Sequence, residues 1–172
     1  MQVLISEAQL SERIQALGAE LTAHYAAIDE PIVLVGVLRG SFVFMADLAR
    51  AMDRPLEVDF MSASSYGDGT VSSGDVKLKT DLQNSIEGRH VLVVEDIVDT
   101  GHTLAKLRSR LQARQPASLR FVSLLDKPSR RENSEAADWI GFTIEDLFVV
   151  GYGLDEAGLN RNLPYVGVKS GD

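Results

Sequence analysis

Two short apolar runs, Ile32–Val37 and Val91–Val94, constrain the fold of this chain more than any other feature of its sequence. Each run has the length of one strand and carries no polar side chain, which is typical of strands buried on both faces of a parallel sheet. Both are followed by segments whose apolar residues recur at steps of three and four, the period of a helix packed on one side. Strands that alternate with helices in this way predict an α/β fold with a mainly parallel sheet flanked by helices.

The same two periods predict the remaining elements. The first helix shows apolar residues from Leu10 to Ile28, and Ser6 with Gln9 fits a capping box at its start. We see no repeat and no sign of a second core, so we expect residues 1–172 to form a single domain. Besides the two apolar runs, the predicted elements are a helix around Phe42–Ala49, strands at 56–62 and Lys77–Asp81, a turn at Glu87-Gly88, a helix over Thr103–Arg114, and strands at Leu119–Leu125 and Phe148–Val150.

Composition excludes several classes of function. The chain has 25 acidic and 17 basic residues, a net charge of −8, which argues against a broad nucleic-acid surface. It has no cysteine, so disulfides, thiolate catalysis and zinc–thiolate sites are excluded and a cytoplasmic location is expected. No apolar run approaches the roughly 20 residues of a membrane helix. An anionic ligand must therefore be held by a few local donors, a helix N-terminus or a metal ion.

Polar residues that could bind a ligand or take part in catalysis follow the second apolar run directly. Glu95 and Asp96 come first, and the stretch Asp99–Thr103 leads into a predicted helix. Ligands of open α/β sheets bind at the carboxyl ends of the strands, where these residues lie. Two hydroxyls and the free N–H groups of a helix N-terminus suit a phosphate monoester. The two acids can accept hydrogen bonds from a sugar diol or hold a divalent cation.

The segment Ser64–Gly74 differs in kind from the rest of the chain. Its sequence, SSYGDGTVSSG, contains three glycines and four serines and few residues able to anchor it. Such composition is common in linkers, and long loops in compact domains are also often functional lids. The sequence leaves both possibilities open.

The string VVEDIVDTGHTL, residues 93–104, resembles the signature that binds phosphoribosyl pyrophosphate (PRPP) in type I phosphoribosyltransferases. Together with four further motifs, it makes the chain from about Pro31 to Val168 similar to the hypoxanthine-guanine phosphoribosyltransferase family. The resemblance implies the type I phosphoribosyltransferase fold, with a small hood and a flexible lid at about 64–74. The further motifs are Val37-Leu38-Arg39-Gly40, Ser65-Tyr66, Asp126-Lys127 and Phe148-Val149-Val150-Gly151-Tyr152.

The resemblance also implies an activity and its residues. The reaction is magnesium-dependent transfer of the 5-phosphoribosyl group from PRPP to N9 of hypoxanthine or guanine, a step of purine salvage. Asp99 matches the general base that takes the purine proton. The PRPP-binding matches are Glu95 and Asp96 at the ribose and its Mg²⁺, together with Asp99, Thr100, Gly101, His102 and Thr103.

Three further groups of residues carry over from the family. Leu38, Arg39 and Gly40 match its pyrophosphate loop, where the family has a cis peptide between the first two residues. Ser65, Tyr66 and Arg161 match further pyrophosphate contacts. Lys127, Phe148, Val149 and Asp155 match the purine site: donor to the 6-oxo group, stacking ring, backbone contact, and a second Mg²⁺ ligand whose carbonyl lies near a guanine 2-amino group.

Three alternatives to this activity can be weighed against the sequence. A response-regulator receiver also ends a strand in paired acids, but too few residues follow Val91 to complete that fold. A regulatory, RNA-binding relative that keeps the PRPP loop would need a basic face, which the net charge of −8 disfavours. A transferase for another base, such as xanthine, fits the same motifs. The family suggests a homodimer or homotetramer and no nucleic-acid or membrane partner.

Overall fold

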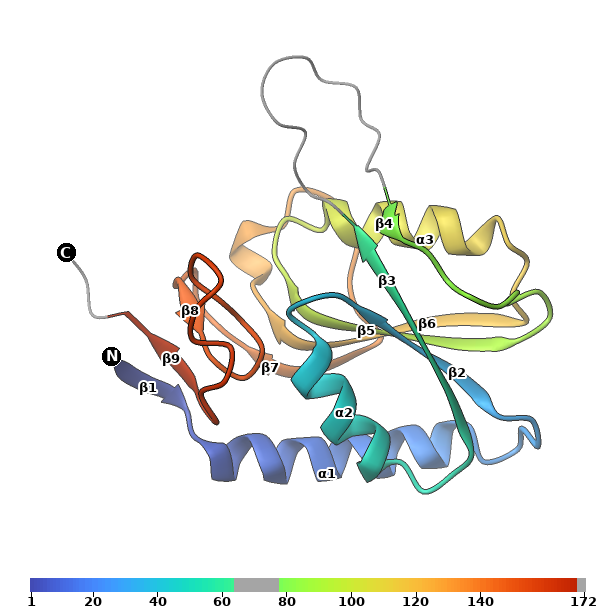
Figure 1. The fold of residues 1–172 in the computed structure, drawn as a ribbon, viewed down its shortest axis with the longest axis horizontal. Helices are drawn as coiled ribbons and strands as arrows, with labels where there is room; N and C mark the ends of the chain where they lie inside the picture. Colours follow the sequence, from blue (N-terminus) through green and yellow to red (C-terminus); the bar gives the residue numbers. More distant parts are fainter. Residues whose placement is uncertain (64–77, 170–172) are drawn as a thin grey trace, which may run out of the picture.

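The computed structural model describes residues 1–63 and 78–169, in which two sheets of unequal size lie side by side (Figure 1). The larger sheet has six strands in the order β4-β3-β2-β5-β6-β7, and all neighbours are parallel except β3 and β4. The prediction of an α/β fold with a mainly parallel sheet is therefore confirmed. The strands are β2 (Ile32–Val37), β3 (Leu56–Ala63), β4 (Leu78–Thr80), β5 (His90–Val98), β6 (Ser118–Asp126) and β7 (Trp139–Thr143).

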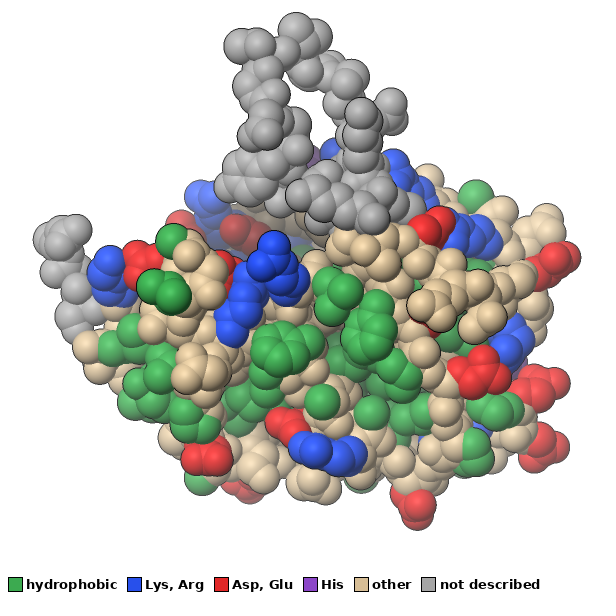
Figure 2. All heavy atoms as spheres, in the orientation of Figure 1, with side chains coloured by type: hydrophobic (Ala, Val, Ile, Leu, Met, Phe, Trp, Pro, Cys, Tyr) green, Lys and Arg blue, Asp and Glu red, His purple; other side chains and the backbone are tan. Residues whose placement is uncertain are grey.

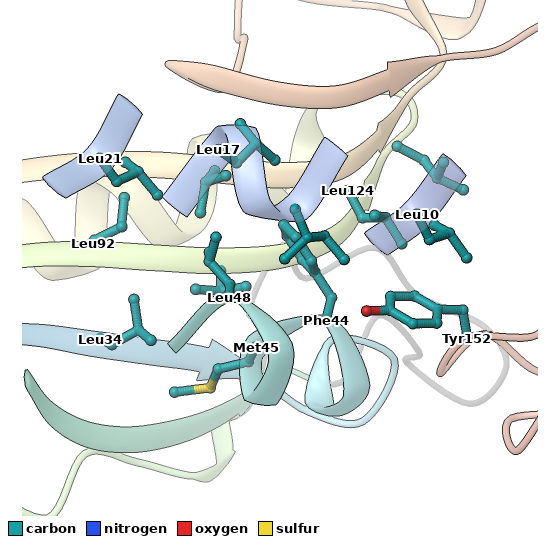
Figure 3. Close-up of a cluster of buried hydrophobic side chains, with 14 of the residues drawn as sticks. Leu10, Leu17, Leu21, Leu34, Phe44, Met45, Leu48, Leu92, Leu124 and Tyr152 are labelled. Carbon is teal, nitrogen blue, oxygen red and sulfur yellow. The ribbon is translucent and has the colours of Figure 1, made fainter. Parts of the chain in front are cut away.

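Helices cover both faces of this sheet. The helices α1 (Glu7–His24) and α2 (Phe42–Ala51) pack on one face, and α3 (His102–Gln112) packs on the other. Alternate residues of each central strand point to opposite faces, so Leu92 meets the first pair of helices and Val93 meets α3. Figure 3 shows the first of these two cores, where leucines of α1 and α2 interdigitate over the sheet.

The first helix begins where the sequence predicts and ends earlier. Ser6 is the N-cap, and its hydroxyl and the Gln9 side chain exchange hydrogen bonds with the backbone as a capping box. The helix stops at His24, with Tyr25 as C-cap, and does not reach Ile28. Both residues still pack against the core, because the chain turns there before entering β2.

The smaller sheet, here called the hood, is antiparallel, with the order β1-β9-β8. Its strands are β1 (Gln2–Ile5), β8 (Val149–Val150) and β9 (Val166–Val168). The predicted strand at Phe148–Val150 thus belongs to the hood and starts one residue later. The sequence predicts neither of its partners, nor β7 of the main sheet.

A membrane-spanning helix is not found in the described part of the chain, since none of its helices combines the necessary length and apolarity.

Candidate active site

A cavity of about 230 Å³ opens at the carboxyl ends of β2 and β5, between the segment after β2 and the start of α3. Much of its lining comes from residues that the sequence predicts as site residues, although they come from two segments far apart in the chain. The parallel register of the two strands brings them together, because Gly36 lies opposite Val94 and the following residues leave the sheet at the same edge. The lining consists of Val37, Leu38, Gly40, Glu95, Asp96, Ile97, Val98, Asp99, Thr100, Gly101, Thr103 and Leu104.

Glu95 and Asp96 form an acidic pair whose negative charge is offset by few donors of the protein. Glu95 is only 5% exposed, and among the residues that the structure describes its Oε1 has no hydrogen-bond partner. Burial and the neighbouring Asp96 raise its pKa well above the ordinary glutamate value. Burial also raises the pKa of Asp96 to about 6, although the backbone N–H of Ile97 donates to its carboxylate at 2.8 Å. Burying a carboxylate oxygen without a donor costs free energy, so this pair suits a cation or a hydrogen-bond donor that a ligand supplies.

These two acids fit a divalent cation held jointly with a substrate. Among residues 1–63 and 78–169, no cluster of three or more potential ligands could hold a metal by itself. Mg²⁺ is commonly bound through one or two carboxylates together with substrate phosphates and waters, and a complete protein cage is not required. The unpartnered Oε1 of Glu95 provides the hard oxygen that such an ion prefers.

The turn from Thr100 to Thr103 lies at the start of α3 and contains groups that could hold an anion. Gly101 is the N-cap residue with φ +90°, a backbone conformation that favours glycine, and a Cβ there would collide with the Asn133 side chain. The first turn of α3 contains no acidic residue, so no carboxylate of that turn offsets the positive end of the helix. This arrangement matches the phosphate monoester predicted from the sequence.

The loop Leu38–Gly40 closes the opposite side of the cavity. The Leu38–Arg39 peptide is cis, as the family resemblance implies. Gly40 is packed from two directions: a Cβ there would overlap the Asp96 carboxylate, and a Cβ at Gly153 of the hood would overlap the Gly40 carbonyl. This loop is therefore wedged between the acidic pair and the hood, with no room for a larger residue at either glycine.

Comparison with known proteins agrees with this geometry. The sequence model of one protein family, the phosphoribosyl transferase domain, matches residues 7–157 of this chain. The hypoxanthine phosphoribosyltransferase of Haemophilus influenzae is 53% identical, over 96% of this chain and 93% of its own. The hypoxanthine-guanine phosphoribosyltransferase of Bacillus subtilis is 51% identical, over 96% of this chain and 91% of its own. A solved hypoxanthine-guanine phosphoribosyltransferase from Bacillus anthracis superposes with a TM-score of 0.92 at 44% identity, covering 99% of both chains.

The chain belongs to the hypoxanthine-guanine phosphoribosyltransferase family. The cavity residues from Glu95 to Leu104 are therefore part of a segment that resembles a signature of this family. The receiver and the regulatory relative, which the sequence already disfavours, are not supported, because relatives matched over nearly their full length are phosphoribosyltransferases.

In this phosphoribosyltransferase, none of the residues predicted to bind the purine lines this cavity. Lys127 is buried to 8% exposure directly after β6, and its Nζ lies 3.6 Å from Asp146. Phe148, just before β8, leaves 59% of its surface exposed, which a core phenylalanine would not do. Val149 is buried in the hood, paired with Val168.

Asp155 and Arg161 are paired with each other in the hood. The Arg161 guanidinium contacts the Asp155 carboxylate at 2.6 Å and donates to the Gly153 carbonyl at 2.7 Å. Arg161 lines a separate hollow of about 500 Å³ between α1, α2 and the segment 161–164, and does not line the smaller cavity. The charges of both residues still act on that site: burial is the main cause that raises the pKa of Asp96, Arg161 opposes it, and Asp155 adds to it.

Three further predicted positions can be placed or set aside. Arg39 is exposed on the loop after β2. The His102 ring points away from the anion site to Glu132, 2.6 Å distant, so only its backbone N–H faces the turn, where it donates to Thr100 Oγ1 at 3.4 Å. Ser65 and Tyr66, like the whole predicted lid at 64–74, lie outside the described residues.

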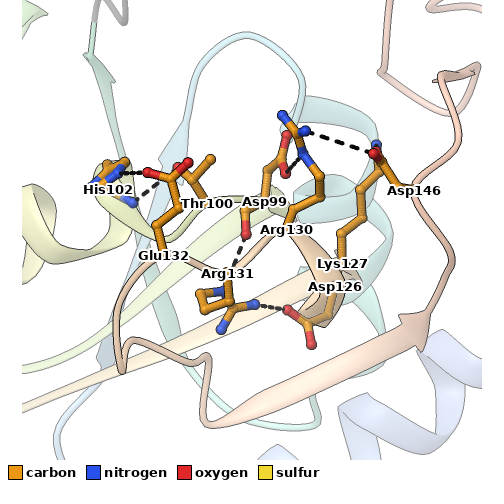
Figure 4. Close-up of polar contacts among 9 residues, drawn as sticks. All are labelled: Asp99, Thr100, His102, Asp126, Lys127, Arg130, Arg131, Glu132 and Asp146. Carbon is orange, nitrogen blue, oxygen red and sulfur yellow. Dashed lines mark hydrogen bonds and ion pairs between the residues drawn. The ribbon is translucent and has the colours of Figure 1, made fainter.

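The structure also contains site residues that sequence reasoning missed. Arg130 and Arg131, at the end of the 3₁₀ turn η1 (Pro128–Arg130) after β6, both hold Asp99. Asp146 joins Lys127 to Arg130 (Figure 4). One signal was present in the sequence: residues three apart share a side of a 3₁₀ turn, and Pro128 favours such a turn between Lys127 and Arg130.

Proposed function

We propose that this protein transfers the 5-phosphoribosyl group from PRPP to N9 of hypoxanthine or guanine, giving IMP or GMP and pyrophosphate. The observation that carries this proposal is the one cavity in which the acidic pair, with Glu95 Oε1 unpartnered among the described residues, converges with Asp99 and with a turn suited to an anion. The turn suits the 5′-phosphate, the acids suit the ribose hydroxyls, and Asp99 lies between them in the chain. The activities named for the relatives support the same assignment.

In the proposed reaction, the bond from C1′ of the ribose to the pyrophosphate oxygen breaks and a bond from C1′ to purine N9 forms. The pyrophosphate leaves with the electron pair of the broken bond, and the proton of the purine passes to the Asp99 carboxylate. The ribose is electron-poor during this exchange, as in glycoside cleavage, so ionised carboxylates beside it are favourable. Asp99 is half-exposed and therefore accessible to an incoming base.

Magnesium fits this proposal through the acidic pair. When bound, Mg²⁺ neutralises charge on the departing pyrophosphate. Glu95 and Asp96 would hold it from the protein side, and the raised pKa of both carboxyls means that binding a cation also displaces protons from them at neutral pH and below. Asp155, the further predicted ligand, would have to leave its ion pair with Arg161 to take part.

The direct test is pyrophosphate release from PRPP and MgCl₂ with a panel of free bases: hypoxanthine, guanine, xanthine and adenine. We expect release with hypoxanthine or guanine and none with adenine, because Lys127 Nζ can only donate and the adenine 6-amino group offers it no acceptor. Release with xanthine alone would instead assign the enzyme to that base. Absence of release with all four bases would refute the proposed transfer.

Base recognition gives the first variant prediction. Phe148→Ala should raise the KM for hypoxanthine about two- to twelve-fold, the equivalent of an aromatic stacking contribution of about 0.5–1.5 kcal/mol. The KM for PRPP should stay unchanged, because Phe148 is exposed and does not line the PRPP cavity. Lys127→Ala should likewise weaken the purine more than PRPP. Equal losses for both substrates, measured by steady-state kinetics, would show a folding defect in place of a recognition role.

We also propose that two copies of the chain associate as a homodimer. Figure 2 shows hydrophobic side chains gathered over α2 and the adjacent β3. Phe42 of α2 is 44% exposed, and Val58 and Phe60 on the same face of β3 are 53% and 38% exposed. Exposed apolar residues that cluster commonly mark an interface. A second copy is the proposed occupant, because homo-oligomers of twofold symmetry bury the same patch on both subunits.

Val58→Glu tests this surface, because it places a charge in the centre of the patch. The expected result is a shift from dimer to monomer in light scattering coupled to size-exclusion chromatography. Val3→Glu is the matched control: Val3 is a strand valine of the hood with 51% exposure, close to the 53% of Val58. A wild-type protein that is monomeric at micromolar concentration, or a Val58→Glu dimer, would contradict the proposed interface.

A further inference from the structure

The segment 127–132 lies along the turn that carries Asp99 and forms hydrogen bonds with it at both ends and in between. The Lys127 N–H donates to the Val98 carbonyl and the Glu132 N–H donates to the Thr100 carbonyl, both at 2.9 Å. Between these two backbone bonds, Arg130 and Arg131 both reach Asp99 (Figure 4). Asp99 is thus held from one side by a single short segment that also carries the predicted purine donor, Lys127.

The two arginines hold different parts of Asp99. Arg131 Nε donates to the Asp99 backbone carbonyl at 3.1 Å, and its guanidinium is nearly buried in an ion pair with Asp126. Arg130 Nε instead donates to the Asp99 carboxylate at Oδ1, at 3.2 Å. Within residues 1–63 and 78–169, the other oxygen, Oδ2, accepts no hydrogen bond. Arg131 therefore fixes the backbone, and Arg130 fixes the rotation of the carboxylate with one oxygen left for a ligand.

Arg130 is itself held at a second point. Its Nη1 lies 3.7 Å from Asp146, which also lies 3.6 Å from Lys127 Nζ. Lys127 and Arg130 meet the same carboxylate because residues three apart share a side of the η1 turn, closed by the Arg130 N–H to the Lys127 carbonyl at 3.0 Å. Four charges of alternating sign thus connect Lys127 to Asp99. The planar guanidinium of Arg130 bridges its two acids, which a point charge cannot do with the same orientation.

We propose that Arg130 is a positioning residue for the reaction: it holds the Asp99 carboxylate so that the free oxygen faces the incoming purine. This inference rests on the proposed function, because it assigns Asp99 the role of proton acceptor. Arg130 is 48% exposed, and an ion pair so exposed contributes little to the stability of a fold. A role in orientation explains a contact that stability does not, since misplacing a catalytic group by about 1 Å can slow a reaction a hundred-fold.

The test is Arg130→Met, which removes the charge and every side-chain donor but keeps a flexible, unbranched side chain. We expect the rate of IMP formation from enzyme-bound PRPP and hypoxanthine to fall about ten-fold in a single turnover, where product release does not contribute. The affinity for PRPP, measured by calorimetry, and the melting temperature should stay at wild-type values. Arg130→Lys should recover only part of the lost rate, because it restores a charged donor to Asp99 but not the planar fork that also meets Asp146.

Arg120→Met is the matched control. Arg120 is 49% exposed and pairs with Asp138 at 3.1 Å, but it lies near the opposite end of β6 from the site, so its removal should change neither rate nor affinity. If wild-type protein forms no nucleotide from PRPP with any base, the proposed function fails first. If wild-type protein is active and Arg130→Met forms IMP within two-fold of its rate, the positioning role is refuted. A loss of rate accompanied by lower PRPP affinity and melting temperature would also refute it, by showing a structural role.

Discussion

Asp99→Asn is expected to bind PRPP as the wild-type protein does and to lose most of its turnover. The change removes the proton acceptor but keeps the shape of the side chain, and general-base assistance is typically worth about 10²–10⁴-fold in rate. The amide oxygen of asparagine can still accept the hydrogen bond that Arg130 Nε donates at 3.2 Å. The phosphate turn and the acidic pair are untouched, so PRPP affinity should persist. Turnover of hypoxanthine and calorimetric titration with PRPP measure the two quantities separately.

Asp81→Asn provides the control for this prediction. Asp81 pairs with Arg114 at 2.8 Å and is 49% exposed, close to the 43% exposure of Asp99 in its pair with Arg130. Loss of an exposed ion pair is common to both variants, whereas loss of a base in the site is specific to Asp99. Near-wild-type turnover of Asp99→Asn would mean that another group accepts the proton, and an equal fall in both variants would point to a general effect of charge.

The main sheet could be predicted because its central strands carry their own signal. Ile32–Val37 is apolar throughout and matches β2 to the residue, since a strand buried on both faces leaves no place for a polar side chain. The edge strand β7 (Trp139–Thr143) has no such signal, because its residues are all partly exposed. The hood strands β1 and β9 are short and pair across nearly the whole chain, so no local pattern announces them.

The same distinction separates the predicted from the unpredicted parts of the site. Glu95 to Thr103 could be predicted because a single strand–turn–helix segment carries the acids, the hydroxyls and the helix start. Arg130 and Asp146 could not, because each acquires its meaning only from partners that the fold supplies. The Asp155–Arg161 pair likewise shows two predicted ligand-binding groups bound to each other, which a motif cannot reveal.

The second large effect is expected from a substitution in the acidic pair, which should lower the activity and raise the stability of the unliganded protein. Burial raises the pKa of Asp96 to about 6, so at pH 8 the folded protein holds an ionised carboxylate that the unfolded chain holds at less cost. Below the folded pKa, the native state takes up a proton that the unfolded state still lacks, and its stability rises. The unliganded protein should therefore gain stability from this group as the pH falls from 8 towards 5, whereas a group with a lowered pKa would behave oppositely.

Asp96→Asn removes this cost and the group's function together. At pH 8 we expect the unliganded variant to be more stable by on the order of 2 kcal/mol, which raises the melting temperature of a chain this size by about 4–8 °C. The gain should shrink as the pH falls through 6. Transfer of the phosphoribosyl group should be lost at every pH, and magnesium pyrophosphate should raise the melting temperature of the wild type only, because ligand binding stabilises only a state that binds it.

Asp126→Asn distinguishes this effect from the loss of any buried charge. The Asp126 side chain is 10% exposed and is paired with Arg131, so the substitution leaves a nearly buried guanidinium without its carboxylate partner. Breaking such a pair destabilises a protein, and this variant should melt below the wild type at pH 8. Asp96 has no such cation bonded to it, and its neighbour Glu95 lacks a donor for Oε1, so the ligand must supply the missing partner. Melting of Asp96→Asn below the wild type at pH 8 without ligand would contradict this account, because it would show that the fold itself depends on the charge.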